Sequence, residues 1–499
     1  MTTITTCPDT TAPGVDAAAR DAAGVAHALA ALGPDARAGM LRTVADALDD
    51  ASEELVGLAH EETGLTTDRL SSELLRTTGQ LRMFADTVLE GSHLDAVIDT
   101  AVVPPPGSGG PPRPDLRRMM VPLGPVLVFA ASNFPFAFSV AGGDTASALA
   151  AGCPVVVKAH PGHPRLSART AHHVTAALGT AGAPHGTFAL IAGLDAGRRA
   201  LQDPHIKAAA FTGSTRAGRA LSDLASARPE PIPFYGELGS INPVFVTERA
   251  VAARGERLVE EYVASFTQGA GQFCTKPGLL LLPAGHGLDQ QLADAVARVV
   301  PARMVSESVH AGYTTGLRRL SEVPGVRTLH GGAPAPEPAA APALLSVPLA
   351  VLRAHAAELL TECFGPMSFV VEYEDEADLA PFAAELPGQL TAALHAENGE
   401  AGRLAALAGV LVERAGRLVW NGWPTGVAVT WSMHHGGPWP ATTAPLHTSV
   451  GATAVRRFMR PVCHQSAPQE ALPPALRDRN VLGIPRRVNG RLGTGDVGT

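Results

Sequence analysis

The sequence predicts an α/β protein with two lobes, each built on a mainly parallel sheet, and a smaller arm. With 499 residues, the chain is long enough for about three units of roughly 150 residues each. Short apolar runs alternate with helical patterns from Val126 to Phe211, and a second alternation begins at Pro243. This alternation is typical of βαβ units, whose strands form parallel sheets.

The N-terminal quarter of the chain is predicted to be helical. Residues 1–14 are expected to form a tail. From Val15 to Leu89 apolar residues recur every three or four positions, for example at Leu41, Val44 and Leu48, which is the period of an amphipathic helix. The Pro- and Gly-rich segment 102–114 that follows predicts a linker.

The first alternation predicts the elements of one lobe. Its strands are expected to be buried on both faces, because they are continuous apolar runs without polar alternation. In chain order, the expected elements are strand Val126–Ala131, helix Ala141–Ala151, strand Val155–Val157, helix Ala168–Leu178, strand Thr187–Ile191, helix Ala196–Leu201 and strand Ala208–Phe211.

The second alternation predicts the other lobe in the same way. Gly331–Pro342 is expected to be a loop, and the Gly-, Pro-, His- and Trp-rich stretch beyond Gly422 shows no regular period. The expected elements are strand Pro243–Val246, helix Ala252–Ser265, strand Leu279–Leu282, helix Leu288–Val300, strand Ser368–Glu372 and strand Ala392–Ala396.

Composition excludes several classes of protein. The formal charge of −8 argues against a nucleic-acid-binding protein. No apolar stretch reaches the length of a membrane span, and the N-terminus lacks the pattern of a signal peptide. The five cysteines form no CxxC pair. We therefore expect no disulfide framework and no metal site, and a cytoplasmic location.

Cys274 stands in a segment suited to a reactive cysteine. Gly269 and Gly271 precede it and let other groups approach the backbone, and Lys276 follows it. A lone cysteine is otherwise most often a small buried apolar residue, which is what we expect of Cys153, Cys363 and Cys463. A nucleophilic thiol also needs a base or a favourable field.

Two polar residues stand where loops would position them. Glu237 lies between Gly236 and Gly239 after a Pro-rich turn, which leaves open a positioned carboxylate or a simple loop cap. Asn133 follows the strand that begins at Val126. Ligands of open α/β sheets bind beyond the carboxyl ends of strands, and an amide there can donate a hydrogen bond to a developing oxyanion. A turn-forming asparagine is the alternative.

Two further segments suit the binding of phosphate or ribose. Phe211-Thr-Gly-Ser214 follows a strand and opens a helix, so Gly213 permits a tight turn and the helix N-terminus can hold a phosphate. Lys158 ends a strand, and His160 lies just beyond it. Alone, each could equally be a surface or turn residue.

Taken together and in this order, the motifs resemble those of the aldehyde dehydrogenase superfamily, along nearly the whole chain. Six sites in this sequence are similar to conserved motifs of the family. They are Asn133-Phe-Pro135, Lys158, Phe211-Thr-Gly-Ser214, Glu237-Leu-Gly239, Gly271-Gln-Phe-Cys274 and Glu362-Cys-Phe-Gly-Pro366.

The resemblance implies a role for each catalytic residue. Cys274 would be the nucleophile that attacks an aldehyde. Asn133 and the backbone amide of Cys274 would form the oxyanion hole, and Glu237 would be the base that activates water to hydrolyse the thioester. This chemistry requires no metal.

The resemblance also implies how a nicotinamide cofactor is held. Glu362 would bind the nicotinamide ribose, and Phe364 would pack near the nicotinamide ring. Lys158 would bind the adenosine ribose, and Gly213 with Ser214 the pyrophosphate.

One departure from the family pattern bears on the choice of cofactor. Members that use NAD often carry a ribose-binding glutamate where this chain has Pro161. Because its absence removes repulsion against a 2′-phosphate, and because Lys158 and His160 could attract one, we expect NADP, with NAD possible.

The domain boundaries implied by the resemblance make a dinucleotide-binding domain of residues 1–101 and 119–240 and a catalytic domain of 241–430. Residues 102–118 and 431–475 would form an oligomerisation arm, and 476–499 a C-terminal tail. The chain would then be a homodimer or homotetramer.

The sequence further resembles the branch of the family that oxidises 2,5-dioxovalerate (α-ketoglutaric semialdehyde). The resemblance lies in Asn421–Gly426, His435–Thr442 and Thr448–Val462. Alternatives are another substrate, such as succinic semialdehyde or a fatty aldehyde, a catalytically retired binding protein, and an enzyme that acylates CoA. Arg456, Arg457 and Arg460 could meet a substrate carboxylate, but the sequence does not single one out.

Overall fold

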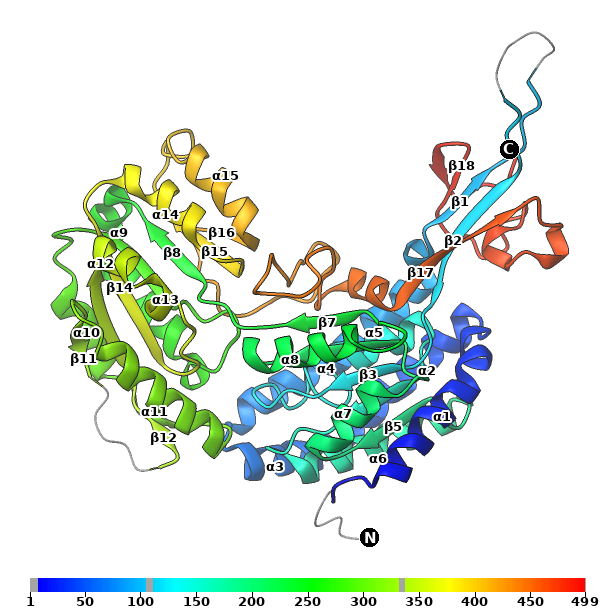
Figure 1. The fold of residues 1–499 in the computed structure, drawn as a ribbon, viewed down its shortest axis with the longest axis horizontal. Helices are drawn as coiled ribbons and strands as arrows, with labels where there is room; N and C mark the ends of the chain where they lie inside the picture. The colour runs from blue at the N-terminus through cyan, green and yellow to red at the C-terminus, as the bar shows by residue number, and fades with distance from the viewer. Residues whose placement is uncertain (1–7, 105–110, 332–336, 499) are drawn as a thin grey trace.

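The computed structural model describes residues 8–104, 111–331 and 337–498. It contains two α/β lobes that lie side by side and an arm sheet that projects from the first lobe (Figure 1). The predicted α/β class and the two parallel-sheet lobes are confirmed. Within the described ranges, no helix is long and apolar enough to cross a membrane.

The first lobe is built on a five-stranded parallel sheet. All four residues of β3 and of β4 are buried, which is why their sequences are apolar without alternation. The order of the strands is β5 (Phe188–Ile191), β4 (Val155–Lys158), β3 (Val126–Phe129), β6 (Ala208–Thr212) and β7 (Phe234–Glu237).

Helices cover both faces of this sheet. Val126 and Val128 face one helical layer, whereas Leu127 faces the other, as the alternation of a strand requires. The first layer contains α2 (Pro34–Asp50), α3 (Ser52–Thr63), α4 (Thr67–Glu90), α5 (Gly143–Ala151) and α6 (Pro164–Thr180). The second contains α1 (Ala12–Ala30), α7 (Leu194–Gln202) and α8 (Thr215–Ser226).

The second lobe holds a seven-stranded sheet, parallel except for its first strand. Its order is β11 (Arg327–His330), β13 (Ala343–Pro348), β14 (Met367–Tyr373), β9 (Leu279–Pro283), β8 (Pro243–Val246), β15 (Gln389–His395) and β16 (Ala415–Trp420). Helices α9 (Glu248–Thr267) and α10 (Asp289–Ala297) cover one face. The other face is covered by α11 (Glu307–Ser321), α12 (Leu349–Ala354), α13 (Ala356–Leu359), α14 (Leu379–Glu385) and α15 (Ala405–Arg414).

The arm sheet joins segments that are distant in the sequence. Its order is β17 (Met459–Gln465), β2 (Leu116–Pro122), β1 (Ala96–Asp99), β18 (Arg486–Val488) and β19 (Arg491–Gly493). The pairing of strands differs from the predicted boundaries in two places. Strand β1 lies in residues assigned to the first domain, and β18 and β19 lie in the expected tail, yet all three pair in the arm sheet.

Some local predictions were wrong. The expected loop Gly331–Pro342 contains β12 (Ala339–Ala340), which pairs with β10 (Ala302–Arg303); residues 332–336 of that loop lie outside the described residues. Glu237 was expected on a loop but is the last residue of strand β7. The strand could not be recognised in the sequence, because proline, which flanks it, and glycine, which it contains at Gly236, are both depleted in strands.

Candidate functional site

A cavity of about 660 Å³ collects most of the predicted site residues. It lies beyond the carboxyl ends of β3, β4 and β6, where open α/β sheets bind ligands, and the second lobe supplies its other wall. Every predicted site residue lines it except Glu237; these are Asn133, Lys158, His160, Gly213, Ser214, Cys274, Glu362 and Phe364.

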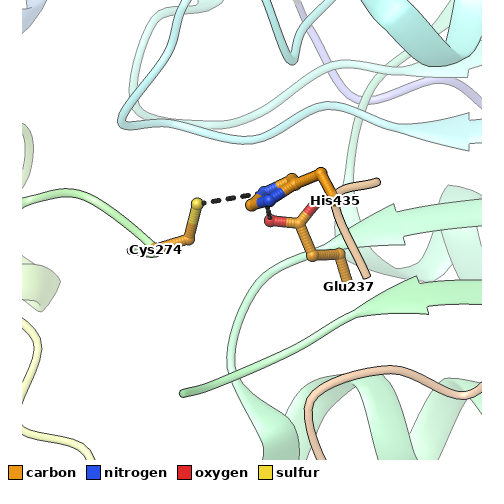
Figure 2. A group of neighbouring side chains, drawn as sticks. All are labelled: Glu237, Cys274 and His435. Atoms are coloured by element: carbon orange, nitrogen blue, oxygen red, sulfur yellow. Dashed lines mark hydrogen bonds and ion pairs between the residues drawn. The ribbon is translucent and has the colours of Figure 1, made fainter. Parts of the chain in front are cut away.

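Cys274 is part of a group of three reactive side chains (Figure 2). Its Sγ lies 3.4 Å from Nε2 of His435, and the same Nε2 lies 2.8 Å from Oε1 of Glu237. The sulfur, nitrogen and oxygen atoms are all within 4.8 Å of one another. A thiol is therefore joined to a buried imidazole and a buried carboxylate, as nucleophilic catalysis needs.

Chain segments far apart in the sequence assemble this group. Glu237 ends β7, and the segment around Thr442 runs antiparallel to it, with Glu237 and Thr442 paired across a β-bridge. This pairing brings His435 beside the Glu237 carboxylate. Ser449 donates a hydrogen bond to the other carboxylate oxygen at 2.6 Å. The backbone amide of His435 donates to Thr448 at 2.8 Å.

The charges of the group follow from burial and neighbours. Burial raises the pKa of the Cys274 thiol well above its usual value, and the negative charge of Glu237 raises it further. Burial alone would also raise the pKa of Glu237, but the charge and hydrogen bond of His435, together with Ser449, lower it below its usual value. The group therefore holds a neutral thiol next to an ionised carboxylate.

Asn133 lies in the same cavity as Cys274, and one of its hydrogen bonds is already made. Its Nδ2 donates to the carbonyl of Gln272 at 3.0 Å. An amide nitrogen carries two N–H donors, so the second is free for an oxygen atom near Cys274. The carbonyl of Asn133 accepts a hydrogen bond from Arg69 at 2.7 Å, which holds the loop after β3 against α4.

At two positions of the predicted motifs only glycine fits, because another chain segment lies too close for a side chain. A Cβ on Gly271, at φ +64°, would lie within 2.2 Å of the carbonyl oxygen of Gly365. A Cβ on Gly239 would lie 2.5 Å from Oε2 of Glu362. These contacts seat the loop that carries Cys274 against the loop that carries Glu362, and they place Glu362 against the motif of Glu237.

Glu362 is half-buried in a loop fixed by Lys276. Burial raises the pKa of Glu362 to about 7, although the charge of Lys276 acts to lower it. Lys276 donates to the carbonyl of Met367 at 2.6 Å and to that of Cys363 at 3.3 Å. Lys276 thus ties the Cys274 loop to the loop of Glu362 and Phe364.

The end of the cavity beside α8 and β4 fits the phosphate groups of a dinucleotide. The N-terminus of α8 opens onto it, and the Ser214 side chain caps this helix by accepting from the amide of Ala217. Lys158 lies at the end of β4 and is buried, and burial lowers its pKa while the charge of Asp9 raises it. A helix N-terminus and a lysine at one end of a long cavity suit a pyrophosphate and its ribose.

His160 lines the cavity, and its contact with a phosphate stays a prediction, made by a neutral side chain. Burial, together with the charges of His163 and Lys158, lowers the pKa of His160 to about 3, so the imidazole is neutral at physiological pH. Its Nδ1 accepts a hydrogen bond from the amide of Gly162. His160 can offer an Nε2–H donor but no positive charge. Arg198, which also lines the cavity, is the cation that sequence reasoning missed.

His435 is the other residue that sequence reasoning missed. It was noted within a Gly- and Pro-rich motif, but nothing in that motif indicated that its side chain reaches a carboxylate and a thiol. Thiolate, imidazole and carboxylate are also zinc ligands. Here the hydrogen bonds among the three groups fix their arrangement, so the geometry needs no metal.

The geometry and the sequence comparison agree on the class of protein. The model of the aldehyde dehydrogenase family matches residues 1–439, and the chain belongs to this family. Its members oxidise aldehydes with NAD or NADP. Alpha-ketoglutaric semialdehyde dehydrogenase 2 of Azospirillum brasilense is 45% identical over 462 residues, which are 91% of this chain and 87% of that relative. Alpha-ketoglutaric semialdehyde dehydrogenase of Acinetobacter baylyi is 44% identical over 460 residues, with the same two coverages.

Solved structures share the fold. Aldehyde dehydrogenase 21 of Physcomitrella patens, determined with the reaction product succinate, aligns with a TM-score of 0.76 and 20% identity and covers 92% of this chain and 91% of its own. A bifunctional proline utilization A protein aligns with the same TM-score and 24% identity; the match covers 92% of this chain but only 45% of that longer protein. At these identities the likeness concerns the fold alone.

Proposed function

We propose that this chain oxidises 2,5-dioxovalerate to 2-oxoglutarate, with NADP as cofactor and Cys274 as nucleophile. The names of the two relatives that are 44–45% identical to it support the substrate. The contact of Cys274 with His435 and Glu237, at one end of a cavity that fits a dinucleotide, carries the mechanism.

The reaction begins with removal of the thiol proton. The imidazole of His435, 3.4 Å from the sulfur, takes it, and the thiolate sulfur then bonds to the aldehyde carbon. The electron pair of the C=O bond moves to its oxygen, where the free N–H of Asn133 and the amide of Cys274 donate hydrogen bonds. Burial favours this step, because it strengthens hydrogen bonds to a developing charge.

The nicotinamide cofactor, when bound, supplies the acceptor for the hydride of this adduct, whose oxidation leaves a thioester on Cys274. Glu362 and Phe364 hold the ribose and the ring in the part of the cavity nearest Cys274. Lys158, Gly213 and Ser214 hold the other end.

Hydrolysis completes the cycle. After the first proton has left for solvent, Glu237 takes a proton from a water molecule, and the resulting hydroxide adds to the thioester carbonyl. Collapse of this intermediate expels the Cys274 thiolate and releases the carboxylic acid. His435 holds the Glu237 carboxylate in place, and the hydrogen bonds from His435 and Ser449 favour its ionised form.

The preference for NADP rests on charge. The position of a ribose-binding glutamate is taken by Pro161, which lines the cavity beside Lys158. Arg198 lines the same region and lies 3.8 Å from Asp195, a long distance for an ion pair. Two cations at this end of the cavity suit a 2′-phosphate.

The proposal includes an oligomer in the cytoplasm. The arm sheet carries exposed apolar side chains, among them Leu492, and we propose that it joins chains into a homodimer or homotetramer. The described cysteines are all free thiols, which suits a reducing compartment.

The test is steady-state formation of the reduced cofactor with 2,5-dioxovalerate, succinic semialdehyde and a long-chain aldehyde, each with NADP and with NAD. The proposal expects the highest kcat/KM with 2,5-dioxovalerate and NADP, and no acceleration by CoA. A preference for another aldehyde would refute 2,5-dioxovalerate as the substrate. An absence of turnover with every pair would leave a binding protein as the better explanation.

A further inference from the structure

The substrate has to reach Cys274 from the side that the cofactor does not fill. The cavity that fits the dinucleotide contains Cys274 and Asn133, but His435 and Glu237 lie outside its lining. The ring of His435 is 6.4 Å from that of Phe138. Phe138 therefore borders the catalytic group outside the cofactor cavity.

Three aromatic rings and two arginines lie together there. The Arg69 guanidinium carbon is 5.2 Å from the ring centroids of both Phe134 and Phe273. The Arg76 guanidinium carbon is 5.9 Å from the ring centroid of Phe134 and 5.6 Å from that of Phe138. Both arginines project from α4, two turns apart on the same face of the helix.

The donors of these arginines are largely unused. Among the described residues, Arg76 makes no hydrogen bond and no ion pair, and its guanidinium lies against the two rings. Arg69 donates to the carbonyl of Asn133, but its Nη1 is buried without a partner. A guanidinium carries five N–H donors, and leaving them unpaired in a half-buried site is costly.

The carboxylate of Glu73 does not pair with the unused donors of the two arginines. Glu73 lies between the two arginines on α4, but its Oε1 accepts from the backbone amides of Phe136 and Ala137. Its Oε2 is buried with no hydrogen-bond partner. Burial raises the pKa of Glu73, which weakens it further as a counter-charge.

Arg76 is also within electrostatic reach of the reacting group. Burial lowers its pKa, whereas the negative charges of Glu73, Cys274 and Glu237 act in the opposite direction. Reciprocally, the charge of Arg76 acts to lower the pKa of Cys274. The guanidinium is therefore within electrostatic reach of the sulfur, and it lies over Phe138, the ring that neighbours His435.

Other arginines near the site have fewer unused donors. Arg457 pairs with Asp144 at 2.7 Å, and Arg460 lies on β17 of the arm sheet. Arg417, which also interacts electrostatically with Cys274, donates from both Nη atoms to the carbonyls of Pro424 and Gly426, so only its Nε is left without a partner.

We infer that Arg76, with Arg69 beside it, forms a carboxylate-binding subsite on the substrate side of Cys274. It would select aldehydes whose far end carries a carboxylate, and the rings of Phe134 and Phe138 would pack against the carbons between the two ends. The inference rests on the proposed function and deepens it, because it assigns the group that recognises the acid end of a five-carbon oxo acid. Bidentate arginine is the residue suited to this task.

The test compares R76M with wild type on two aldehydes of equal chain length, 2,5-dioxovalerate and pentanal. We expect kcat/KM for 2,5-dioxovalerate to fall about ten- to a hundredfold, mostly through KM, because a charge-assisted hydrogen bond is lost. For pentanal kcat/KM should stay unchanged or rise. R76K should keep part of the preference. The matched control is R82M, on the same helix, where an exposed arginine pairs with Asp46 and Asp49.

A second measurement does not depend on turnover. Glutarate should slow the alkylation of Cys274 by iodoacetamide in wild type and R82M, and about tenfold more glutarate should be needed in R76M. A large drop in melting temperature would reveal that R76M fails to fold. In that case R76K is compared with wild type instead.

The outcomes separate the two proposals. If wild type prefers 2,5-dioxovalerate and R76M keeps that preference and its protection by glutarate, the subsite is overturned and the proposed function stands. An equal loss on both aldehydes also overturns the subsite. If wild type prefers pentanal, the proposed function and the subsite fall together.

Discussion

The imidazole Nε2 of His435 lies 2.8 Å from the carboxylate of Glu237, and both side chains are almost completely buried, with exposed fractions of 1% and 3%. The same nitrogen is 3.4 Å from the sulfur of Cys274. The base and the nucleophile are thus coupled through one imidazole, and the predictions below follow from this coupling and from the cavity beside it.

Replacing His435 should impair the activation of Cys274. In H435A the Glu237 carboxylate loses the partner that lowers its pKa, and the thiol loses a hydrogen bond, so we expect kcat to fall about a hundredfold or more. The rate of Cys274 alkylation at neutral pH should fall in parallel. The neighbouring residue gives the control, H434A. Equal activities of the two variants would show that His435 has no part in the reaction.

Removing the nucleophile should separate binding from chemistry. C274A should have no measurable dehydrogenase activity and should bind NADP with a Kd close to that of wild type, measured by titration calorimetry. C463A, which removes an exposed thiol in the arm, should behave as wild type. Residual turnover by C274A would refute the assignment of the nucleophile.

Replacing Glu237 should slow hydrolysis of the thioester. In E237Q the amide cannot take a proton from water, so we expect steady-state turnover to drop by about two to three orders of magnitude. Rapid mixing should still show a burst of reduced cofactor. A slowed burst followed by normal turnover would place Glu237 in another step.

Adding a carboxylate at position 161 should shift the choice of cofactor. In P161E the new charge would repel a 2′-phosphate and could accept hydrogen bonds from ribose hydroxyls. The ratio of kcat/KM with NADP to that with NAD should fall by about tenfold or more. R198A should lower kcat/KM for NADP alone. If neither variant changed the ratio of kcat/KM with NADP to that with NAD, the 2′-phosphate of NADP would bind elsewhere.

Cofactor affinity should depend on pH through Glu362. Its pKa is raised to about 7, so the carboxyl is mostly protonated below that pH and ionised above it. Because a carboxylate accepts hydrogen bonds from ribose hydroxyls more strongly than a carboxylic acid, the KM for NADP should fall as pH rises through about 7. E362Q should remove this dependence. A wild-type KM that is flat from pH 6 to 8 would contradict the assignment.

The sequence predicted the buried centre of the fold better than its edges. Strands β3 and β4 are continuous apolar runs enclosed by helices, so their composition identifies them. Strand β16 is half-exposed along its length and carries Arg417, so it shows no such run. The full extent of the arm sheet escaped prediction because β1 pairs with β18, nearly four hundred residues away, and no local pattern encodes such a partner.

The candidate site shows the same division. Cys274 and Asn133 follow from motifs whose glycines and strand ends are local features. His435 does not, because its partners are 198 and 161 residues away in the chain and only the fold brings them together. The charge of His160 could not be predicted either, since its burial depends on the packing of the cavity.

The most direct test of the account is the mass of the peptide that contains Cys274, after E237Q has been mixed with 2,5-dioxovalerate and NADP and quenched in acid. We predict an acyl adduct on Cys274 that forms only when NADP is present and that is absent in the E237Q/C274A double variant. An adduct on Cys153, Cys363 or Cys463, or reduced cofactor formed without any adduct, would contradict a thioester mechanism at Cys274.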